Sequence, residues 1–367
     1  MVGRSRYTLP LSTPLRRKFD TLAEVLDVHV LAAAGAGSRG ADPRFRLFRP
    51  LPLGRLEGAA FYALLPLRVA RALRELRPDA VLVQGAQETS LVLLGRALAR
   101  SRAKVVLDVH GDWQAPTRLY GSPWRRALSP LADLLARRAL RRADAVRTIS
   151  SYTSGLVRAH GVEPAAIFPA FMDLDPFLEA EPVPPPSLPT ALFVGVLERY
   201  KAVDVLAEAW PQVASRVPGA ELRIVGRGTL APVVERLVAA SSGRVVWTQS
   251  LPGDAVAGAL DSATVLVLPS RSEGLGRVVV EAFCRGRPVI GSRIGGIPDL
   301  VTDGQTGLLV PAEDAGALAA ALVSVLSDSE LATRLGAAGR RAVEPWLATP
   351  EDYAAAVRDL VEQVAVG

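Results

Sequence analysis

A glycine-rich loop flanked by two glutamates is the segment of this chain best suited to bind a ligand. Residues 269–281 contain Glu273, the two glycines of the loop and Glu281. Gly274 and Gly276 let the backbone approach a ligand closely, and a helix starting after them would direct free N–H groups and its positive dipole end at a phosphate. Glu281, about one turn into that helix, is suited to accept hydrogen bonds from two vicinal hydroxyls, as a ribose offers. The loop therefore predicts a site for a phosphorylated, sugar-containing ligand.

The elements that must position this loop follow a regular alternation of strand and helix. Short apolar runs are separated by helical patterns such as residues 64–77. Because strands that alternate with helices form parallel sheets, we expect α/β domains that bind ligands outside the carboxyl ends of their strands. The expected strands are 26–33, 79–85, 104–110, 143–150, 165–170, 191–197, 220–226, 243–249, 263–269 and 287–292.

The length and one proline-rich segment predict how the domains are divided. At about 150 residues per domain, 367 residues favour two domains. The prolines of residues 179–189 forbid both a helix interior and a central strand, so we expect a linker there. The predicted organisation is a first domain over 1–175, a linker over 176–190, a second domain over 191–349 and a last helix over 350–367 that packs back on the first domain.

The composition narrows the class of protein and of site. The single cysteine, Cys284, excludes a disulfide framework, and three scattered histidines leave little for a multi-histidine metal site. We expect no metal and a reducing, cytoplasmic location. The sequence shows neither a membrane-length apolar run nor the apolar core of a secretory leader, so we expect no export.

The charge is distributed unevenly along the chain. Residues 1–175 carry a net charge of +12 and residues 176–367 a net charge of −6. A basic first half suggests an anionic partner such as a membrane surface, a phosphorylated lipid or nucleic acid. The arginine-rich helical pattern over 123–142 is either a solvated face above core leucines or an amphipathic surface resting on anionic lipid. No nucleic-acid motif or aromatic stacking pattern accompanies the charge, so we expect no nucleic acid as partner.

The loop and the segments after it resemble the signature of the retaining glycosyltransferases of family 4. That family has two glutamates separated by seven residues around a glycine loop, matched by Glu273 and Glu281. A second glycine turn, matched in residues 288–299, and a further turn, matched in 303–310, follow. The resemblance implies the GT-B fold, in which two Rossmann-like, doubly wound parallel-sheet domains face each other across a cleft. It also implies a nucleoside-diphosphate sugar as donor.

The resemblance extends to the start of the second domain and implies a grip on the diphosphate. The family has a glycine at the first strand end and a basic pair after it, matched here by Gly195 and Lys201. Val196 and Ala202 replace the family's usual arginine and glycine. We expect Arg199 to supply the missing charge, because the arginine fork can hold phosphate oxygens bidentately.

The resemblance also implies roles for individual side chains. Lys201 and Arg199, with the amides of residues 274–276, would stabilise the charge that grows on the departing diphosphate. Glu281 would hold the ribose, while Glu273 and His110, the latter at the end of the strand 104–110, would contact the sugar. The residues expected to bind the donor are Gly195, Gly226, Leu251, Gly274, Leu275, Gly276 and Glu281.

These observations predict a metal-independent, retaining hexosyltransferase that needs no cofactor beyond its nucleotide-sugar substrate. The basic first half favours a sugar or lipid-linked acceptor in envelope polysaccharide or glycolipid synthesis, with peripheral contact to the inner face of the cell membrane. Two alternatives remain open at this point. One is a non-hydrolysing nucleotide-sugar epimerase, and the other is a non-catalytic binding protein on the same fold.

Overall fold

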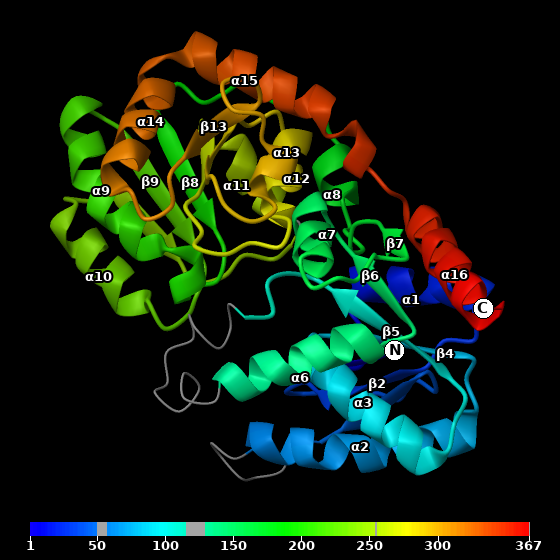
Figure 1. The fold of residues 1–367 in the computed structure, drawn as a ribbon. Helices are drawn as coiled ribbons and strands as arrows, with labels where there is room; N and C mark the ends of the chain where they lie inside the picture. The colour runs from blue at the N-terminus through cyan, green and yellow to red at the C-terminus, as the bar shows by residue number, and fades with distance from the viewer. Residues whose placement is uncertain (50–56, 115–128, 254, 367) are drawn as a thin grey trace. The chain divides into compact units, whose positions relative to one another are not determined.

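The structure is a computed structural model that describes residues 1–49, 57–114, 129–253 and 255–366. The chain divides into two compact units, each built on its own parallel β-sheet (Figure 1). Unit 1 contains the described residues up to Phe171 and from Ala348 onward, and unit 2 contains those from Met172 to Leu347. The α/β class predicted from the strand–helix alternation is confirmed.

Unit 1 has a seven-stranded parallel sheet in the order β3-β2-β1-β4-β5-β6-β7. Its strands are β1 (Val2–Tyr7), β2 (Val30–Ala34), β3 (Phe45–Phe48), β4 (Ala80–Gln84), β5 (Lys104–Val109), β6 (Ala145–Thr148) and β7 (Ala166–Ile167). Its helices are α1 (Thr13–Val25), α2 (Glu57–Leu76), α3 (Ala86–Ala99), α6 (Ser129–Arg142), α7 (Ser151–Arg158) and α16 (Pro350–Val366). Successive side chains of a strand point to opposite faces, so the apolar runs of β4 and β5 need cover on both sides.

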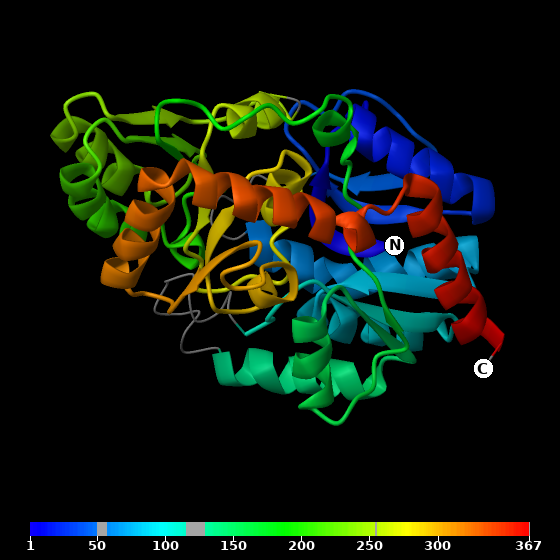
Figure 2. The same cartoon turned by 90° about the horizontal axis from the view of Figure 1, so that it is seen from above.

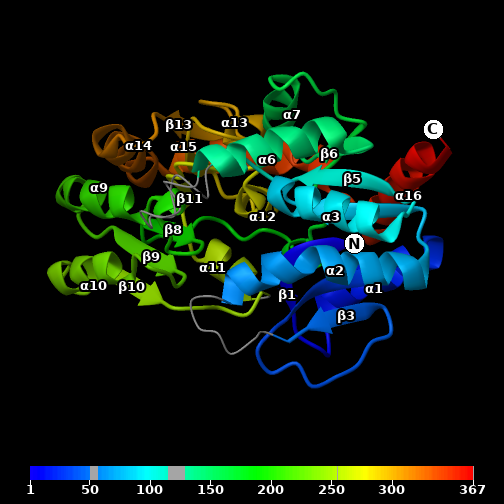
Figure 3. The same ribbon diagram turned by 60° about the horizontal axis from the view of Figure 1, so that its bottom comes forward.

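The two faces of this sheet are covered by different helices. Leu82 and Val106 belong to a core cluster that also contains Phe19 of α1 and Val357 of α16. Figures 1 and 2 show α16, in red, beside α1. Val105, the neighbour of Val106 on β5, points to the other core cluster, beneath α2. Figure 3 shows α2, α3 and α6 lying side by side. The last helix of the chain is thus part of unit 1, although the rest of unit 1 ends before residue 172.

Unit 2 has a six-stranded parallel sheet in the order β10-β9-β8-β11-β12-β13. Its strands are β8 (Thr190–Val194), β9 (Glu221–Val225), β10 (Val245–Thr248), β11 (Val265–Leu268), β12 (Val289–Ser292) and β13 (Gly307–Val310). Its helical elements are α8 (Asp175–Leu178), η2 (Arg199–Lys201), α9 (Val203–Arg216), α10 (Ala231–Ala240), α11 (Ala255–Asp261), α12 (Arg277–Cys284), α13 (Ile297–Leu300), α14 (Ala315–Ser327), α15 (Ser329–Ala342) and η3 (Glu344–Trp346). The strand order reverses between β8 and β11, which is where doubly wound sheets bind ligands.

The division between the units differs from the predicted boundary and linker. It falls between Phe171 and Met172, and residues 176–190 belong to unit 2 rather than to a separate linker. Two arginines that are almost fully buried hold this segment in place. Arg285 donates to the carbonyl oxygens of residues 177 and 181 at 3.3 and 3.1 Å, and Arg287 donates to that of residue 183 at 2.8 Å. The prolines prevent regular structure there, but the free carbonyls still bind arginine side chains.

Three strands were not among those expected from the sequence. Polar residues interrupt the apolar runs of β1 and β3, whereas β13 is apolar but lies in residues 303–310, which were interpreted as a turn. Part of the arginine-rich pattern, residues 123–128, lies outside the described residues, and the rest forms α6. Within the described parts of the chain, no single helix has the length and apolar character to cross a membrane. The pair α14 and α15 passes that test jointly but bends by 100° at its break.

Candidate functional site

The central feature of unit 2 is an ion pair at the point where the strand order reverses. Lys201 lies in η2, in the loop after β8, and Glu273 lies in the loop after the adjacent strand β11. The Lys201 Nζ atom donates a hydrogen bond to Glu273 Oε2. Each side chain is only 14% exposed. The fold thus joins two residues 72 positions apart at the carboxyl edge of the sheet.

Arg271, in the loop after β11, holds the turn that carries Lys201. The Arg271 amide donates to the Tyr200 carbonyl oxygen at 2.7 Å. Its guanidinium donates to the Arg199 carbonyl oxygen at 2.7 Å and binds both carboxylate oxygens of Asp204, in the first turn of α9, at 2.8 and 2.9 Å. It also pairs with Glu313 at 2.7 Å. Because these bonds join the loop after β11 to η2 and α9, Arg271 positions Lys201 without facing it directly.

Arg199 differs from Lys201 in its surroundings. Its side chain is exposed and forms no ion pair with any described residue, although its carbonyl is bound by Arg271. Because Arg199 is two residues before Lys201 in η2 and has no counter-ion among the described residues, its guanidinium is available to a ligand with negative charge.

The glycine pair Gly295 and Gly296 lets two loops of this edge touch through their backbones. A Cβ atom at Gly295 would lie 2.1 Å from the Glu273 carbonyl oxygen, and one at Gly296 would lie 2.3 Å from the Gly274 carbonyl oxygen. The Gly296 amide also donates to the Glu273 carbonyl at 3.0 Å. The second glycine turn therefore packs directly against the backbone of the loop that carries Glu273.

We expect Gly296→Ala to weaken nucleotide-sugar binding by at least about tenfold, because the added methyl group must displace the backbone at Gly274. Calorimetric titration of the donor nucleotide measures this effect. The control is Gly258→Ala in α11, where an added Cβ meets nothing within 4 Å. Equal affinities for Gly296→Ala and the wild type would show that the loop adapts without loss.

The other glycines follow the same principle. A Cβ at Gly226 would lie 1.8 Å from the Gly195 carbonyl oxygen, so the loops after β8 and β9 approach more closely than any side chain permits. Trp247 of β10 donates its indole N–H to the Gly226 carbonyl at 2.8 Å. Leu251, in the loop after β10, is partly exposed at the same sheet edge. This close approach gives Gly226 a structural reason to be glycine that is independent of any ligand, whereas a Cβ at Gly195 would make only ordinary contacts at 3.5 Å or more.

The helix α12 begins directly after the loop. Gly276 is its N-cap with φ of 95°, a left-handed conformation that favours glycine, and Leu275 before it is buried. Glu281 is also buried, and its Oε1 atom accepts a hydrogen bond from Nε of Arg277 at 2.6 Å. Burial raises the pKa of Glu281, against the opposing charge of Arg277. The structure thus gives Glu281 a partner that the sequence did not suggest, four residues earlier on the same helix.

In unit 1 the histidine at the end of β5 belongs to a buried polar network. His110 Nε2 lies 2.8 Å from Asp108 Oδ2, and Arg147 of β6 donates to Asp108 Oδ1 at 2.6 Å. Asp108 and Arg147 are almost fully buried. Burial alone would raise the pKa of Asp108, but the charges of His110 and Arg147 lower it to about 2. The carboxylate is therefore ionised and can only accept, so His110 Nε2 carries the proton of this hydrogen bond.

Aromatic rings and a lysine enclose this network from the α1 and α16 side. Lys18 lies 5.2 Å from the ring centre of Tyr353, and the Arg147 guanidinium carbon lies 4.0 Å from that of Phe168. Burial lowers the pKa of Lys18 to about 8. The network fixes the plane of the His110 ring, while the side chain itself remains partly exposed.

The predicted site residues thus lie at the carboxyl edges of two sheets, Lys201, Arg199, Glu273 and the donor-binding residues in unit 2 and His110 in unit 1. Among the described residues, no group of three or more His, Cys, Asp or Glu side chains is arranged to hold a metal ion. Sequence reasoning missed Arg271 and Arg147 as organisers of the two edges. Their partners are 67 and 39 residues away, and no local pattern marks such contacts.

The fold of the whole chain defines a GT-B glycosyltransferase architecture. Sucrose-phosphate synthase from Thermosynechococcus elongatus aligns with a TM-score of 0.78 at 22% identity and covers 100% of this chain and 99% of that one. HepE of Anabaena in complex with UDP-glucose aligns with a TM-score of 0.70 at 17% identity, again over 100% and 99%. The fold class implied by the sequence resemblance is confirmed.

Sequence comparison assigns the chain to a family within this fold. Residues 188–328 match the model of the glycosyl transferases group 1, and residues 5–169 match the glycosyl transferase 4-like domain. A GDP-mannose-dependent alpha-(1-6)-phosphatidylinositol monomannoside mannosyltransferase of Mycolicibacterium smegmatis is 30% identical over 282 residues, which cover 70% of each chain. The chain belongs to the group 1 glycosyltransferases of the family 4 type.

Proposed function

We propose that this protein moves a hexose from a nucleoside-diphosphate sugar to an acceptor hydroxyl with retention of the anomeric configuration. The observation that carries the proposal is the Lys201–Glu273 pair at the strand-order reversal of unit 2. A cation is held there by a carboxylate and by the braced turn of Arg271, so it needs little rearrangement to meet a diphosphate. Membership of the glycosyltransferase family supports this use of the edge.

In this proposal the leaving diphosphate is stabilised by cations of the protein. Lys201 and the unpaired Arg199 supply the charge, and the amides at residues 274–276 supply hydrogen bonds ahead of α12. We propose that the reaction is metal-independent for this reason. Transfer should continue unchanged in EDTA.

Glu281 and Glu273 are proposed to hold the hydroxyl groups of the donor. Only Oε1 of Glu281 is used by Arg277, and Oε2 accepts no hydrogen bond from a described residue, so it can accept one from the ribose. Glu273 can bind a sugar hydroxyl through the oxygen that does not face Lys201. His110, whose Nε2 proton faces Asp108, is proposed to bind a sugar hydroxyl through Nδ1.

GDP-mannose is the first donor to test, because the mycobacterial relative is GDP-mannose-dependent. We propose a glycolipid acceptor for the same reason, reached by peripheral contact with the inner face of the cell membrane. Leu131 and Leu134 of α6 are 54% and 62% exposed and share the helix with Arg137 and Arg138, as an interfacial helix requires.

Calorimetric titration of GDP, UDP, ADP and dTDP without metal tests the donor site. We expect one nucleotide to bind, and Glu281→Ala to bind it about 10- to 100-fold more weakly, because a hydrogen bond to a charged group is lost. The control is Glu235→Ala, an exposed carboxylate on α10. Binding of no nucleotide, or equal binding by Glu281→Ala, would overturn the assignment of the site.

Product analysis then tests the reaction itself. With GDP-mannose and phosphatidylinositol monomannoside, we expect release of GDP that depends on the acceptor, and an α-linked product by NMR. A β-linked product would contradict retention. Isomerisation of the nucleotide sugar without acceptor would point to an epimerase instead.

A further inference from the structure

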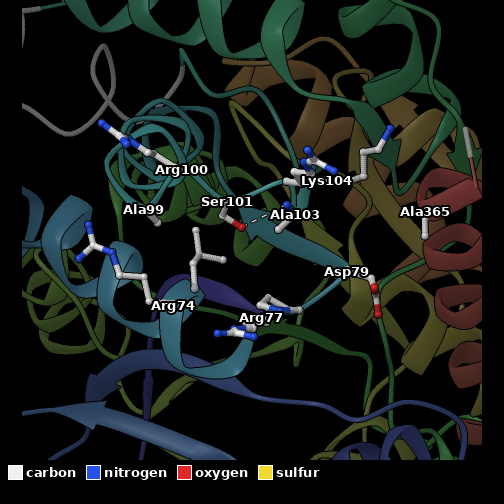
Figure 4. Close-up of a pocket in the computed structure, with 12 residues that line it drawn as sticks. Arg74, Arg77, Asp79, Ala99, Arg100, Ser101, Ala103, Lys104 and Ala365 are labelled. Atoms are coloured by element: carbon white, nitrogen blue, oxygen red, sulfur yellow. Dashed lines mark hydrogen bonds between the residues drawn. The ribbon is translucent and has the colours of Figure 1, made fainter.

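The amino-end edge of the unit 1 sheet carries a pocket that the proposed transfer reaction does not use. It has a volume of about 560 Å³ and lies where α2 and α3 end and where β4 and β5 begin (Figure 4). His110 follows the other end of β5, six residues long, so the pocket and the histidine are about 20 Å apart along the sheet. The pocket is therefore a separate site from the carboxyl edge.

The lining of this pocket is strongly cationic. Five basic residues line it, namely Arg74, Arg77, Arg100, Arg102 and Lys104, against one carboxylate, Asp79. None of the six forms an ion pair with a described residue. By contrast, arginines elsewhere in unit 1 are commonly paired, as Arg96 is with Asp144. Five cations around one hollow that holds a single carboxylate repel one another, and an anion would relieve that repulsion.

The ends of α2 and α3 account for only part of this charge. Arg74 donates to the Leu98 carbonyl oxygen in the last turn of α3 at 2.6 Å, as a basic residue at a helix C-terminus does. Arg77 and Arg100 follow these two helices with φ of 47° and 53°. Arg102 precedes β5 and Lys104 is its first residue, and neither side chain donates to a helix carbonyl within the described part of the chain. The pocket therefore contains more basic residues than are needed to bind the carbonyl groups at the two helix ends.

An apolar pocket adjoins the cationic one. It has a volume of about 250 Å³, and Leu26, Val69, Leu76 and Val361 are among its lining residues. The two pockets share the lining residues Leu73, Arg77, Pro78 and Asp79. A single ligand can therefore place a charged group in one and a hydrocarbon group in the other.

We propose that these joined pockets bind an amphiphilic phosphate, with the phosphate among the arginines and the alkyl chain in the apolar pocket. Arginine suits the phosphate because its fork donates two hydrogen bonds to neighbouring oxygens. The hydrocarbon gains from burial against Val69 and Leu76. The ligand is either a free monomer or a phospholipid in a bilayer, since both present this chemistry.

Calorimetry with monomeric decyl phosphate tests the proposal, with inorganic phosphate and the uncharged decyl maltoside as comparison ligands. We expect decyl phosphate to bind at least about tenfold more tightly than either, because only it fills both pockets. Arg77→Asn/Arg100→Asn should weaken its binding by at least about tenfold, and asparagine tolerates the left-handed backbone at both positions. Val361→Phe, which fills the apolar pocket, should remove the advantage over inorganic phosphate.

The matched control is Arg236→Ser/Arg334→Ser, which removes two exposed, unpaired arginines from unit 2. It should bind decyl phosphate as the wild type does. If the asparagine variant unfolds early in a thermal scan, Arg102→Gln/Lys104→Gln makes the same test from the other side of the pocket.

Sedimentation with phosphatidic acid vesicles distinguishes the two sources. Binding that is lost in the pocket variants supports a bilayer lipid, whereas binding of decyl phosphate without vesicle binding supports a free monomer. Decyl phosphate that binds no better than inorganic phosphate, or pocket variants that bind like the wild type, would overturn the proposal. None of these measurements depends on sugar transfer, so the outcome for the pocket proposal is independent of the proposed function.

Discussion

Lys201→Ala should lower kcat for sugar transfer by about 10²- to 10³-fold, the loss typical when one preorganised group facing the transition-state charge is removed. Lys201 is mostly buried and is held by Glu273. It lies on a turn that Arg271 stabilises through hydrogen bonds to the Arg199 carbonyl and to Asp204. A cation held in this way stabilises a departing diphosphate more than a flexible surface lysine does, because it does not have to be reoriented during the reaction. Steady-state kinetics with the identified donor measure the change.

Two comparisons separate the charge of Lys201 from its shape. Lys201→Arg keeps the charge with a different geometry and should retain part of the activity. Arg216→Ala removes an exposed cation at the end of α9 in the same unit and should leave kcat unchanged. A Lys201→Ala enzyme with wild-type kcat would show that the leaving group is stabilised elsewhere.

Asp108→Asn should destabilise unit 1 by about 3–5 kcal/mol, because it leaves the buried Arg147 without a carboxylate. Asparagine has nearly the shape of aspartate, so the effect reports the charge rather than a cavity. The pKa of Asp108 is lowered to about 2 in the folded protein, below the value near 3.9 of an unfolded chain. The stabilisation is therefore present above about pH 4 and is lost as the pH falls through 2.

Thermal and urea unfolding near neutral pH measure this difference. Glu24→Gln, which removes an exposed carboxylate from α1 of the same unit, should change the stability by less than about 0.5 kcal/mol. Asp108→Leu/Arg147→Met removes both charges and should recover much of the loss. If Asp108→Asn is as stable as the wild type, Arg147 does not depend on this carboxylate.

The parts predicted well from the sequence were those with a dense local pattern. The apolar run of residues 263–269 and the glycines after it predicted a strand, a loop and a helix, and the structure has β11, the loop and α12 there. The family was also recognised from that loop and is confirmed. The strand β1 lacked such a pattern, because its second half carries Ser5 and Arg6, which are exposed.

Apolar periodicity by itself determined the α/β class of this protein, and the glutamate–glycine loop determined its family. Both patterns are local, since buried strands demand apolar runs and a close backbone turn demands glycine. Tertiary structure decided which charges meet: Lys201 with Glu273, Arg271 with Asp204, and Asp108 with Arg147. It also joined residues 176–190 to unit 2 through Arg285 and Arg287. Such pairings depend on which strands lie side by side, and strand order is set by packing of the whole sheet rather than by neighbours in the chain.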